Sequence, residues 1–348
     1  MHKLKEISIV GRSKAKTVLR GDRTLNFKHK SVMLEEVLNA LDVKPNGIYL
    51  DCTLGGGGHS RAVGEQLGKD GMIIGLDQDD DAIAAATENL SGLACGVKIF
   101  RENFSRLEKI LDDSCADKID GVLFDLGVSS YQIDTAQRGF SYIKNSPLDM
   151  RMDRRRTLTA HDVINRYDED RLIKIFREYG EERFSKRIAA AICRERKISS
   201  IETTGELVKL IEQAAPRTKN GGHPAKRIFQ AIRIEVNGEL EILADAIKKA
   251  VARLKIGGRI AIITFHSLED RIVKETFKTL AQGCICPKNF PVCVCNHKPE
   301  IKILGKAKTP TPEEINLNSR ASSAKLRVAE KILDSRSTIN FCRSSKEE

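Results

Sequence analysis

Residues 51–60, DCTLGGGGHS, join a buried apolar run to an amphipathic one. The preceding run, Gly47 to Leu50, is typical of a strand, and the following run, Arg61 to Leu67, predicts a helix that Gly68 ends. A strand, a glycine loop and a helix in this order form a turn that binds nucleotides. Glycine lets backbone N–H groups approach a ligand closely, and the helix N-terminus carries partial positive charge.

The glycine loop does not fit a dinucleotide. The dinucleotide fingerprint G-x-G-x-x-G needs a third glycine, which is missing whether the count starts at Gly55, Gly56 or Gly57. Asp51 at the strand end would also repel a pyrophosphate. A carboxylate there suits a ligand with an ammonium or sulfonium group, and S-adenosylmethionine carries both. The alternative is that the four glycines only mark a flexible turn.

The next strand favours the nucleoside ligand. Met72 to Leu76 is apolar and ends at Asp77, which lies 20 residues beyond Gly57, near the spacing at which a carboxylate binds ribose hydroxyls in βαβ units. The three acids that follow, Asp79 to Asp81, precede a helical run and are assigned as helix caps.

Two further strands complete the pattern. Val97 to Phe100 precedes Phe104, and Gly121 to Phe124 precedes Asp125. The alternation of strands and helices from residue 32 to residue 130 predicts a parallel sheet covered on both faces. Ligands of such sheets bind beyond the carboxyl ends of the strands. The residues predicted to converge there are Asp51, Asp77, Phe104 and Asp125.

Composition favours a polyanionic partner. The 348 residues include 59 Lys and Arg against 48 Asp and Glu, a net charge of +11. The alternative is ordinary solubility charge. Aromatic residues make up 5% of the chain, with no Trp, which disfavours a surface that stacks many bases. No apolar run approaches 18 residues, so we expect neither a transmembrane helix nor a membrane partner.

The two chain ends predict disordered segments, and the cysteines indicate a reducing compartment. Residues 1–27 are basic and lack the apolar core of a secretory signal, so we predict a disordered extension, with an organelle-targeting peptide as the alternative. Residues 334–348 predict a disordered tail. The nine cysteines are odd in number and five of them are scattered singly, which disfavours a disulfide framework and predicts a cytoplasmic protein.

The predicted sheet is interrupted by a helical insert. Residues 28–135 form the first part of the core, residues 136–220 carry several helical runs and no convincing strand, and residues 221–333 return to the core. Residues 227–254 are largely helical, Arg259 to Phe265 predicts a buried strand, and Ser323 to Ile332 a last one. We expect the insert to contact the substrate. Two roles are equally consistent with its arginines, which either contact phosphate groups or form a solvent-exposed face. They are Arg151, Arg154, Arg155 and Arg156.

Long motifs resemble one family in the same order along the chain, over roughly residues 28–333. They are VMLEEVL (32–38), GIYLDCTLGGGGHS (47–60), DGVLFDLGVSSYQID (120–134), RGFSY with PLDMRMD (138–153), YGEERF (179–184), HPAKRIFQAIRIEVNGEL (223–240) and ITFHSLEDRIVK (263–274). The chain resembles the ribosomal small-subunit methyltransferase H family, also called MraW. Lys226, Ile228, Ser319 and Ser322 depart from the family pattern, which leaves fine contacts to RNA open.

The resemblance implies a fold, a reaction and a set of site residues. The implied fold is a Rossmann-like class I S-adenosylmethionine-dependent methyltransferase with an inserted helical domain. The implied reaction is methylation of N4 of one cytidine in 16S ribosomal RNA of the small ribosomal subunit, near the decoding centre. The implied cofactor contacts are Gly57, Gly58, His59, Asp77, Phe104, Asp125 and Gln132.

The proton acceptor stays unassigned. The delocalised N4 lone pair makes the amine a poor nucleophile, so an acceptor for its N–H would help. The candidates are Asp125, the turn 127–130 and His266. Methylation at C5 would instead need a cysteine nucleophile, and none follows Asp125 or His266. Arg227 and the arginines at 151–156 are the expected phosphate contacts, and the target base must be unstacked.

Several alternatives stay open. The cysteines at 284, 286, 293 and 295 suit tetrahedral zinc or are unligated thiols on a loop, and no metal ligand is assigned. The chain could be a non-catalytic ribosome-assembly or RNA-binding factor, although the intact acids and glycines oppose that. Another RNA or DNA cytosine could be the substrate. The sequence leaves the oligomeric state open, a homodimer included.

Overall fold

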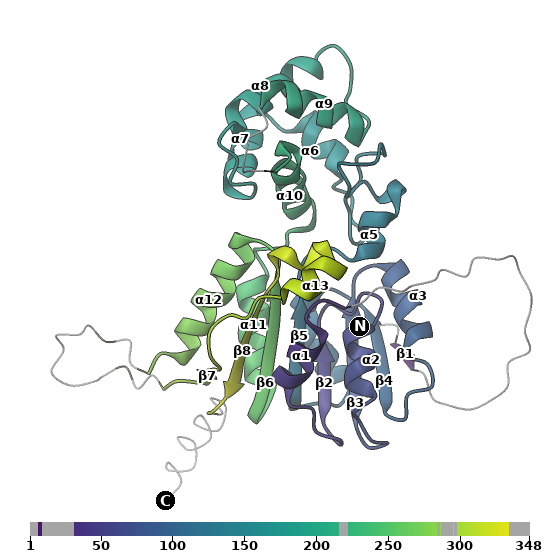
Figure 1. Cartoon of the computed structure of the whole chain (residues 1–348), viewed down its shortest axis with the longest axis vertical. Helices are drawn as coiled ribbons and strands as arrows, with labels where there is room; N and C mark the ends of the chain where they lie inside the picture. Colours follow the sequence, from purple (N-terminus) through teal and green to yellow (C-terminus); the bar gives the residue numbers. More distant parts are fainter. Residues whose placement is uncertain are drawn as a thin grey trace, which may run out of the picture. The chain divides into compact units, whose positions relative to one another are not determined.

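The computed structural model describes residues 31–215, 222–283, 286, 295 and 298–333, and the backbone of residues 6–8. The chain divides into two compact units (Figure 1). The sheet unit comprises Met1–Gly127 and Leu243–Glu348, and the helical unit comprises Val128–Ile242. Each unit is described by itself below.

The sheet unit is built on one eight-stranded sheet of order β1-β4-β3-β2-β5-β6-β8-β7. Strands β4, β3, β2, β5 and β6 run parallel, β8 is antiparallel to both β6 and β7, and β1 is antiparallel to β4. The strands are β1 (Glu6–Ser8), β2 (Ile48–Asp51), β3 (Met72–Asp77), β4 (Gly96–Arg101), β5 (Ile119–Asp125), β6 (Leu254–Thr264), β7 (Ile301–Ile303) and β8 (Lys325–Lys331).

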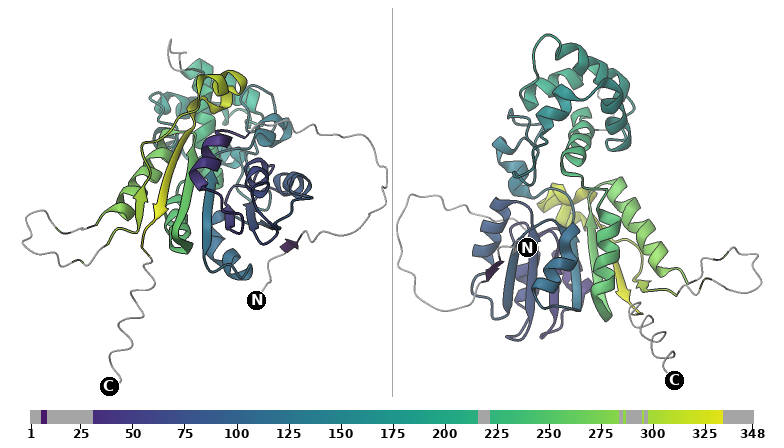
Figure 2. Two further views of the ribbon diagram at one scale, coloured as in Figure 1. Left: turned by 60° about the horizontal axis from the view of Figure 1, so that its bottom comes forward. Right: turned by 180° about the vertical axis from the view of Figure 1, so that it is seen from behind.

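Helices cover both faces of this sheet (Figure 2). One face packs on α4 (Leu107–Asp113), α11 (Leu243–Arg253) and α12 (Ser267–Ala281). The other packs on α1 (Leu34–Leu41), α2 (Gly58–Gly64) and α3 (Asp80–Asn89). Because both faces are buried, the central strands carry apolar residues on both faces instead of alternating, and β5, in which Asp120 and Asp125 are the charged residues, is buried at every position but its last. The predicted doubly wound α/β fold is confirmed.

Short elements complete the sheet unit. The 3₁₀ turn η1 (Phe104–Arg106) follows β4, and α13 (Pro312–Leu317) and the 3₁₀ turn η3 (Ser319–Ser323) precede β8. Strand β8 confirms the predicted last strand. Strand β1 lies within the extension predicted to be disordered, so that prediction is wrong for residues 6–8, which pair with the β4 edge. The rest of residues 1–27 and the tail 334–348 lie outside the described residues.

The helical unit has a core of its own. Its helices are α5 (Ser130–Asp134), α6 (Ala160–Arg166), α7 (Glu169–Glu178), α8 (Ser185–Glu195), α9 (Thr204–Ala214) and α10 (Pro224–Asn237), with the 3₁₀ turn η2 (Ala136–Arg138). Side-chain oxygens cap α6, α7 and α9 at Thr159, Asp168 and Thr203, which explains where these helices begin.

The unit is longer at both ends than the predicted insert 136–220. It begins at Val128 and continues to Ile242, because α10 buries Ile228, Phe229 and Ile232 in the same core as α7 and α8. The stretch 227–254, predicted to be largely helical, is helical in two segments. Gly238, with φ 63°, ends α10 and donates its N–H to Ile234, and α11 begins at Leu243.

No helix in the described part of the chain has the length and apolar composition that crossing a membrane requires.

Candidate active site

Three acids lie at one edge of the sheet because their strands are parallel and in register. Asp51 ends β2 and pairs with Gly75 on β3, so Asp77 lies two residues further along β3. Asp125 ends β5 beside Ile263 on β6. The carboxyl ends of β2, β3, β5 and β6 therefore meet at the same edge, as the sequence predicts. This is the edge at which ligands bind in open α/β sheets.

The glycine loop packs too closely to accept side chains. Gly57, the N-cap of α2, has φ 77°, and a Cβ atom there would lie 3.3 Å from Leu90 Cγ. A Cβ atom at Gly58 would lie 2.2 Å from Ser31 Oγ. The loop therefore presents bare backbone at the start of α2, which allows close approach of a ligand.

Asp77 links the glycine loop to the next strand. Its Oδ2 accepts the N–H of Gly55 (2.8 Å) and its Oδ1 accepts the N–H of Asp79 (2.9 Å). Loss of water around the carboxyl group raises the pKa of Asp77 to about 6, although the two N–H donors act in the opposite direction. The carboxylate keeps further lone pairs for a ligand hydroxyl. Asp79 caps α3, as predicted.

His59 and Asp125 face each other across the edge. His59, on α2, is 6% exposed, and its Nε2 lies 3.5 Å from Asp125 Oδ2. Within the described residues, the two ring nitrogens of His59 and Oδ1 of Asp125 have no hydrogen-bond partner. Buried polar atoms without partners are uncommon in folded proteins. This pair therefore fits a site that a polar ligand completes.

Asp51 does not share this arrangement. Its Oδ2 accepts Ser60 Oγ (2.6 Å), its Oδ1 accepts the N–H of Thr53 (3.1 Å), and burial raises the pKa of its carboxyl group. The expected contact of Asp51 with a charged ligand is therefore replaced by contacts that anchor the glycine loop. Thr53 extends this anchor, because its Oγ1 accepts the N–H of Asp125 (2.6 Å).

The remaining predicted residues lie in two places. Phe104 follows β4, also at the carboxyl edge, and its ring packs edge-to-face on Phe124 with centroids 5.6 Å apart. Gln132 belongs to the helical unit, where it is buried on α5 and forms a capping box with Ser129. Its role as a cofactor contact stays a prediction.

His266, a candidate proton acceptor, contacts the helix that it precedes. It is the N-cap of α12, and its Nδ1 accepts the N–H of Glu269 (3.4 Å). Its Nε2 lies 3.0 Å from Glu269 Oε1. Both nitrogens therefore lie toward Glu269, although Nε2 has no hydrogen-bond partner among the described residues.

One hydrogen bond at the start of α1 was not predicted from the sequence. The N–H of Met33 donates to Glu314 Oε1 on α13 (2.6 Å), across 281 residues of chain. Met33 has a left-handed backbone with φ 54° and is the N-cap of α1. This bond fixes the segment that carries Ser31, which touches Gly58.

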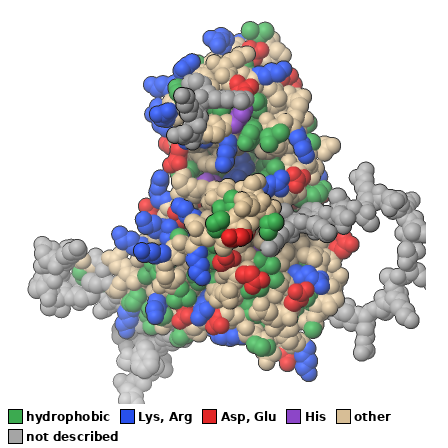
Figure 3. Space-filling view, viewed as in Figure 1, with side chains coloured by type: hydrophobic (Ala, Val, Ile, Leu, Met, Phe, Trp, Pro, Cys, Tyr) green, Lys and Arg blue, Asp and Glu red, His purple; other side chains and the backbone are tan. Residues whose placement is uncertain are grey.

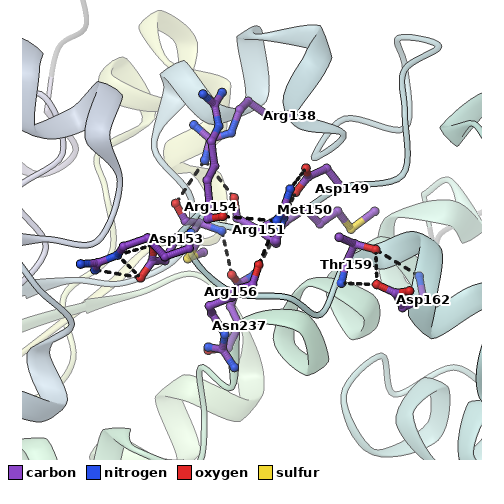
Figure 4. A network of polar contacts seen from close by, with 12 residues as sticks. Arg138, Asp149, Met150, Arg151, Asp153, Arg154, Arg156, Thr159, Asp162 and Asn237 are labelled. Carbon is purple, nitrogen blue, oxygen red and sulfur yellow. Dashed lines mark hydrogen bonds and ion pairs between the residues drawn. The ribbon is translucent and has the colours of Figure 1, made fainter.

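The arginines at 151–156 hold their own loop together (Figure 4). Arg151 donates from Nε and Nη2 to the two oxygens of Asp149 (2.9 and 2.7 Å), and Arg155 pairs in the same way with Asp153. Arg156 donates to the carbonyl of Asn237 (2.5 Å). The expected role as phosphate contacts is therefore weakened for Arg151 and Arg155, because a carboxylate compensates the charge of each.

The zinc hypothesis is not tested. Cys284 and Cys293 lie outside the described residues, whereas Cys286 is a free thiol. Over the residues that are described, no group of three or more His, Cys, Asp or Glu side chains is arranged to hold a metal ion.

Comparisons with known proteins identify relatives of this chain. A curated relative from Clostridium botulinum (strain Kyoto / Type A2), "Ribosomal RNA small subunit methyltransferase H", is 54% identical over 310 residues, covering 88% of this chain and 100% of that protein. A relative of the same name from Clostridioides difficile (strain 630) is 52% identical over 311 residues, with the same coverage. A solved structure of a "putative rRNA-methylase" from Clostridium thermocellum matches with 14% identity and a TM-score of 0.43, covering 87% of this chain and 100% of that one, which is too distant to support an argument.

The family model described as the MraW methylase family matches residues 26–332. That range spans the sheet unit from α1 to β8, with its glycine loop and the three strand-end acids, and the whole helical unit. The chain therefore belongs to the MraW methylase family.

Proposed function

We propose that this protein transfers a methyl group from S-adenosylmethionine to N4 of a cytidine in 16S ribosomal RNA, near the decoding centre of the small ribosomal subunit. The observation that carries the proposal is the match to "Ribosomal RNA small subunit methyltransferase H" along the full length of that relative. The choice of N4 and of the decoding centre follows from the motif resemblance. The reaction would take place in the cytoplasm.

The residues at the sheet edge fit the cofactor. Gly57 and Gly58 leave backbone open to a nucleoside, and Asp77 has lone pairs for ribose hydroxyls. His59 supplies buried ring nitrogens without partners among the described residues. The other proposed contacts are Phe104, Asp125 and Gln132. When bound, S-adenosylmethionine supplies a methyl group already activated by the sulfonium charge, so the protein contributes mainly placement and electrostatics.

Asp125 is the proposed acceptor for the N–H of the target amine. Its Oδ1 has no hydrogen-bond partner within the described residues, and its backbone is fixed by Thr53. Accepting one N–H of the amine would hold the nitrogen lone pair toward the methyl group. A strong base is not required, because the N–H that Asp125 accepts becomes acidic once the methyl group is attached, and its proton then passes to the carboxylate.

Methylation at C5 is disfavoured by the same geometry. A C5 reaction needs a cysteine thiolate beside the base. Cys52 follows β2 but is buried in the core under the sheet, and burial raises the pKa of its thiol well above the usual value. A thiol that is both inaccessible and protonated cannot attack a pyrimidine ring.

The test is to supply purified protein with S-adenosylmethionine and small subunits from cells that lack it, and to map the modified atom by mass spectrometry. We expect one N4-methylcytidine in 16S ribosomal RNA. Methylation of a different atom or of another RNA would replace the proposed substrate. Failure to bind S-adenosylmethionine in calorimetry would favour the non-catalytic assembly factor.

A further inference from the structure

A cluster of basic side chains surrounds the start of α8 in the helical unit. Arg183, Lys186 and Arg187 are exposed. In the described parts of the chain, none of the three lies within 4.0 Å of a carboxylate oxygen. Figure 3 shows Lys and Arg side chains on the surface of the helical unit in the region of α7 and α8. These cations differ from Arg151 and Arg155, each of which forms an ion pair with an aspartate of its own loop.

Their place in the helix is electrostatically unfavourable. Lys186 and Arg187 occupy the first turn of α8, which contains no acidic residue. The N-terminus of a helix carries partial positive charge, so cations there repel it and anions stabilise it. Phe184, the N-cap, has no side-chain acceptor for the free N–H groups of the first turn. The Glu182 carboxylate already accepts the N–H of Phe184 (2.9 Å) just before this turn, and an anion held by Lys186 and Arg187 would add to that stabilisation.

Phe184 orders two of the guanidinium groups. The Cζ atoms of Arg183 and Arg187 lie 5.8 and 5.7 Å from the centroid of its ring, within the range of a cation–π contact. The ring is partly exposed and packs against the core of the helical unit. An aromatic ring flanked by guanidinium groups can stack on a base while the arginines bind phosphates, which is a common arrangement for RNA.

Helix α10 adds two further cations. Arg227 donates to the carbonyl of Glu181 (3.3 Å), and Gln230 donates to the carbonyl of Tyr179 (2.9 Å). These bonds hold the turn before α8 against α10, and Lys226 beside Arg227 is exposed. A Cβ atom at Gly180 would lie 2.8 Å from the carbonyl oxygen of Arg227, which shows how closely the two segments pack.

The charge of the cluster stays positive when nearby acids are counted. Glu182 is buried, with Oε2 3.9 Å from Arg227, and Glu181 lies in the same turn. Residues 181–187 and 226–227 thus contain two acids and five cations: Arg183, Lys186, Arg187, Lys226 and Arg227. These five residues are called the α8 basic cluster below.

We propose that the α8 basic cluster binds the phosphate backbone of the substrate RNA, with Phe184 stacking on a base beside it. This rests on the proposed function, since it names the surface that holds the RNA for that reaction. The cluster, and not the arginine loop at 151–156, is the phosphate-binding part of the helical unit.

The test compares two double variants of the full-length protein. Arg183→Ala/Arg187→Ala removes two charges from the cluster. Arg166→Ala/Lys209→Ala removes two charges from exposed positions on α6 and α9. Affinity for protein-free 16S ribosomal RNA is measured over a range of salt concentrations. Removing one phosphate-binding cation lowers the slope of log affinity against log salt by about 0.7–0.9, so the cluster variant should have a slope smaller by about 1.5.

The same substitutions should weaken binding roughly tenfold near 150 mM salt, whereas the α6/α9 variant should bind as the wild type does. Affinity for S-adenosylmethionine and thermal unfolding should be unchanged in both. Arg183→Lys/Arg187→Lys, which keeps the charge, should restore most of the slope. A merely structural role of the two arginines would alter unfolding and would not be rescued in this way.

Two outcomes would overturn the proposal. One is an Arg183→Ala/Arg187→Ala variant with the salt slope of the wild type. The other is a loss of binding to intact small subunits but not to protein-free RNA, which would assign the cluster to a ribosomal protein. If instead the wild type neither binds nor methylates 16S ribosomal RNA, the proposed function itself fails. That outcome is separate from the comparison of the variants.

Discussion

Nε2 of His59 and Oδ2 of Asp125 lie 3.5 Å apart, although one residue begins a helix after β2 and the other ends β5. The glycine loop and the strand register together produce this proximity. The buried nitrogens of His59 and Oδ1 of Asp125 lack partners within the described residues, so both groups are available to a ligand.

His59→Ala should therefore weaken binding of S-adenosylmethionine. Loss of one hydrogen bond in a buried site costs on the order of 1–2 kcal/mol, so the dissociation constant should rise roughly tenfold. Isothermal calorimetry measures it. The control is His161→Ala, because His161 lies in the helical unit and pairs there with Glu202. Wild-type affinity in the His59 variant would remove this residue from the proposed site.

Alanine substitutions at Gly57 and Gly92 can separate the effect of backbone strain on stability from the effect of the glycine-loop shape on cofactor binding. Both have left-handed φ angles, 77° and 79°, but a Cβ atom at Gly57 would touch Leu90 and Ala86, whereas one at Gly92 would meet nothing within 4 Å. Either residue changed to Ala should lower the free energy of unfolding by about 1–2 kcal/mol, because L-residues disfavour this conformation.

Only Gly57→Ala should also weaken binding of S-adenosylmethionine, since it displaces the backbone at the start of α2. Chemical denaturation gives the stabilities and calorimetry gives the affinities. Equal affinity in the two variants would show that the shape of the glycine loop does not matter for binding.

The site could be predicted where it depends on strand ends. The convergence of Asp77 and Asp125 follows from apolar runs that end in acids, because parallel strands place their carboxyl ends on one edge. The helix-capping role of Asp79 could also be predicted from local sequence, because its carboxylate oxygen accepts the N–H of Asp81, two residues away. Such features need only local sequence and one topological rule.

Features that depend on distant partners could not be predicted. Asp51 looks like a ligand contact from its position, but its Oδ2 accepts a hydrogen bond from Ser60, which lies on the next helix. The bond from Met33 to Glu314 joins segments with no sequence relation. The insert was predicted too short because the amphipathic pattern of α10 does not say which of two cores it enters.

Asp77 predicts a pH dependence of cofactor binding. The pKa of Asp77 is about 6 in the ligand-free protein, so its carboxyl group is mostly ionised above pH 6 and mostly protonated below it. The ionised form accepts ribose hydroxyls better because it has more free lone pairs. Affinity for S-adenosylmethionine should therefore fall as the pH decreases from about 7.5 to about 5.5, roughly threefold or more.

Asp77→Asn should bind more weakly at about pH 7.5 and should lose this dependence, because an amide does not titrate in this range. Calorimetry at several pH values in buffers of matched ionic strength is the measurement. If the slope with pH is the same in the variant and in the wild type, another group causes it.

Arg138 predicts a large loss of stability in the helical unit. Its side chain is 2% exposed and donates to the carbonyls of Arg151 (2.9 Å) and Met152 (3.2 Å), while its own carbonyl accepts the N–H of Met150 (3.0 Å). Asn237 holds the same segment by accepting the N–H of Met152 (2.8 Å). Figure 4 shows this network around the 149–156 loop.

Arg138→Ala would remove the guanidinium donor to the carbonyl groups of Arg151 and Met152, and each lost bond at a buried group costs about 1–3 kcal/mol, so unfolding should become easier by roughly 3 kcal/mol. Arg166→Ala is the matched control. Arg166 is 75% exposed and forms a surface pair with Asp162, which contributes less than about 1 kcal/mol. Urea denaturation followed by circular dichroism measures both. Equal losses would mean that water replaces the Arg138 guanidinium, and that the arginine loop holds its shape without this clamp.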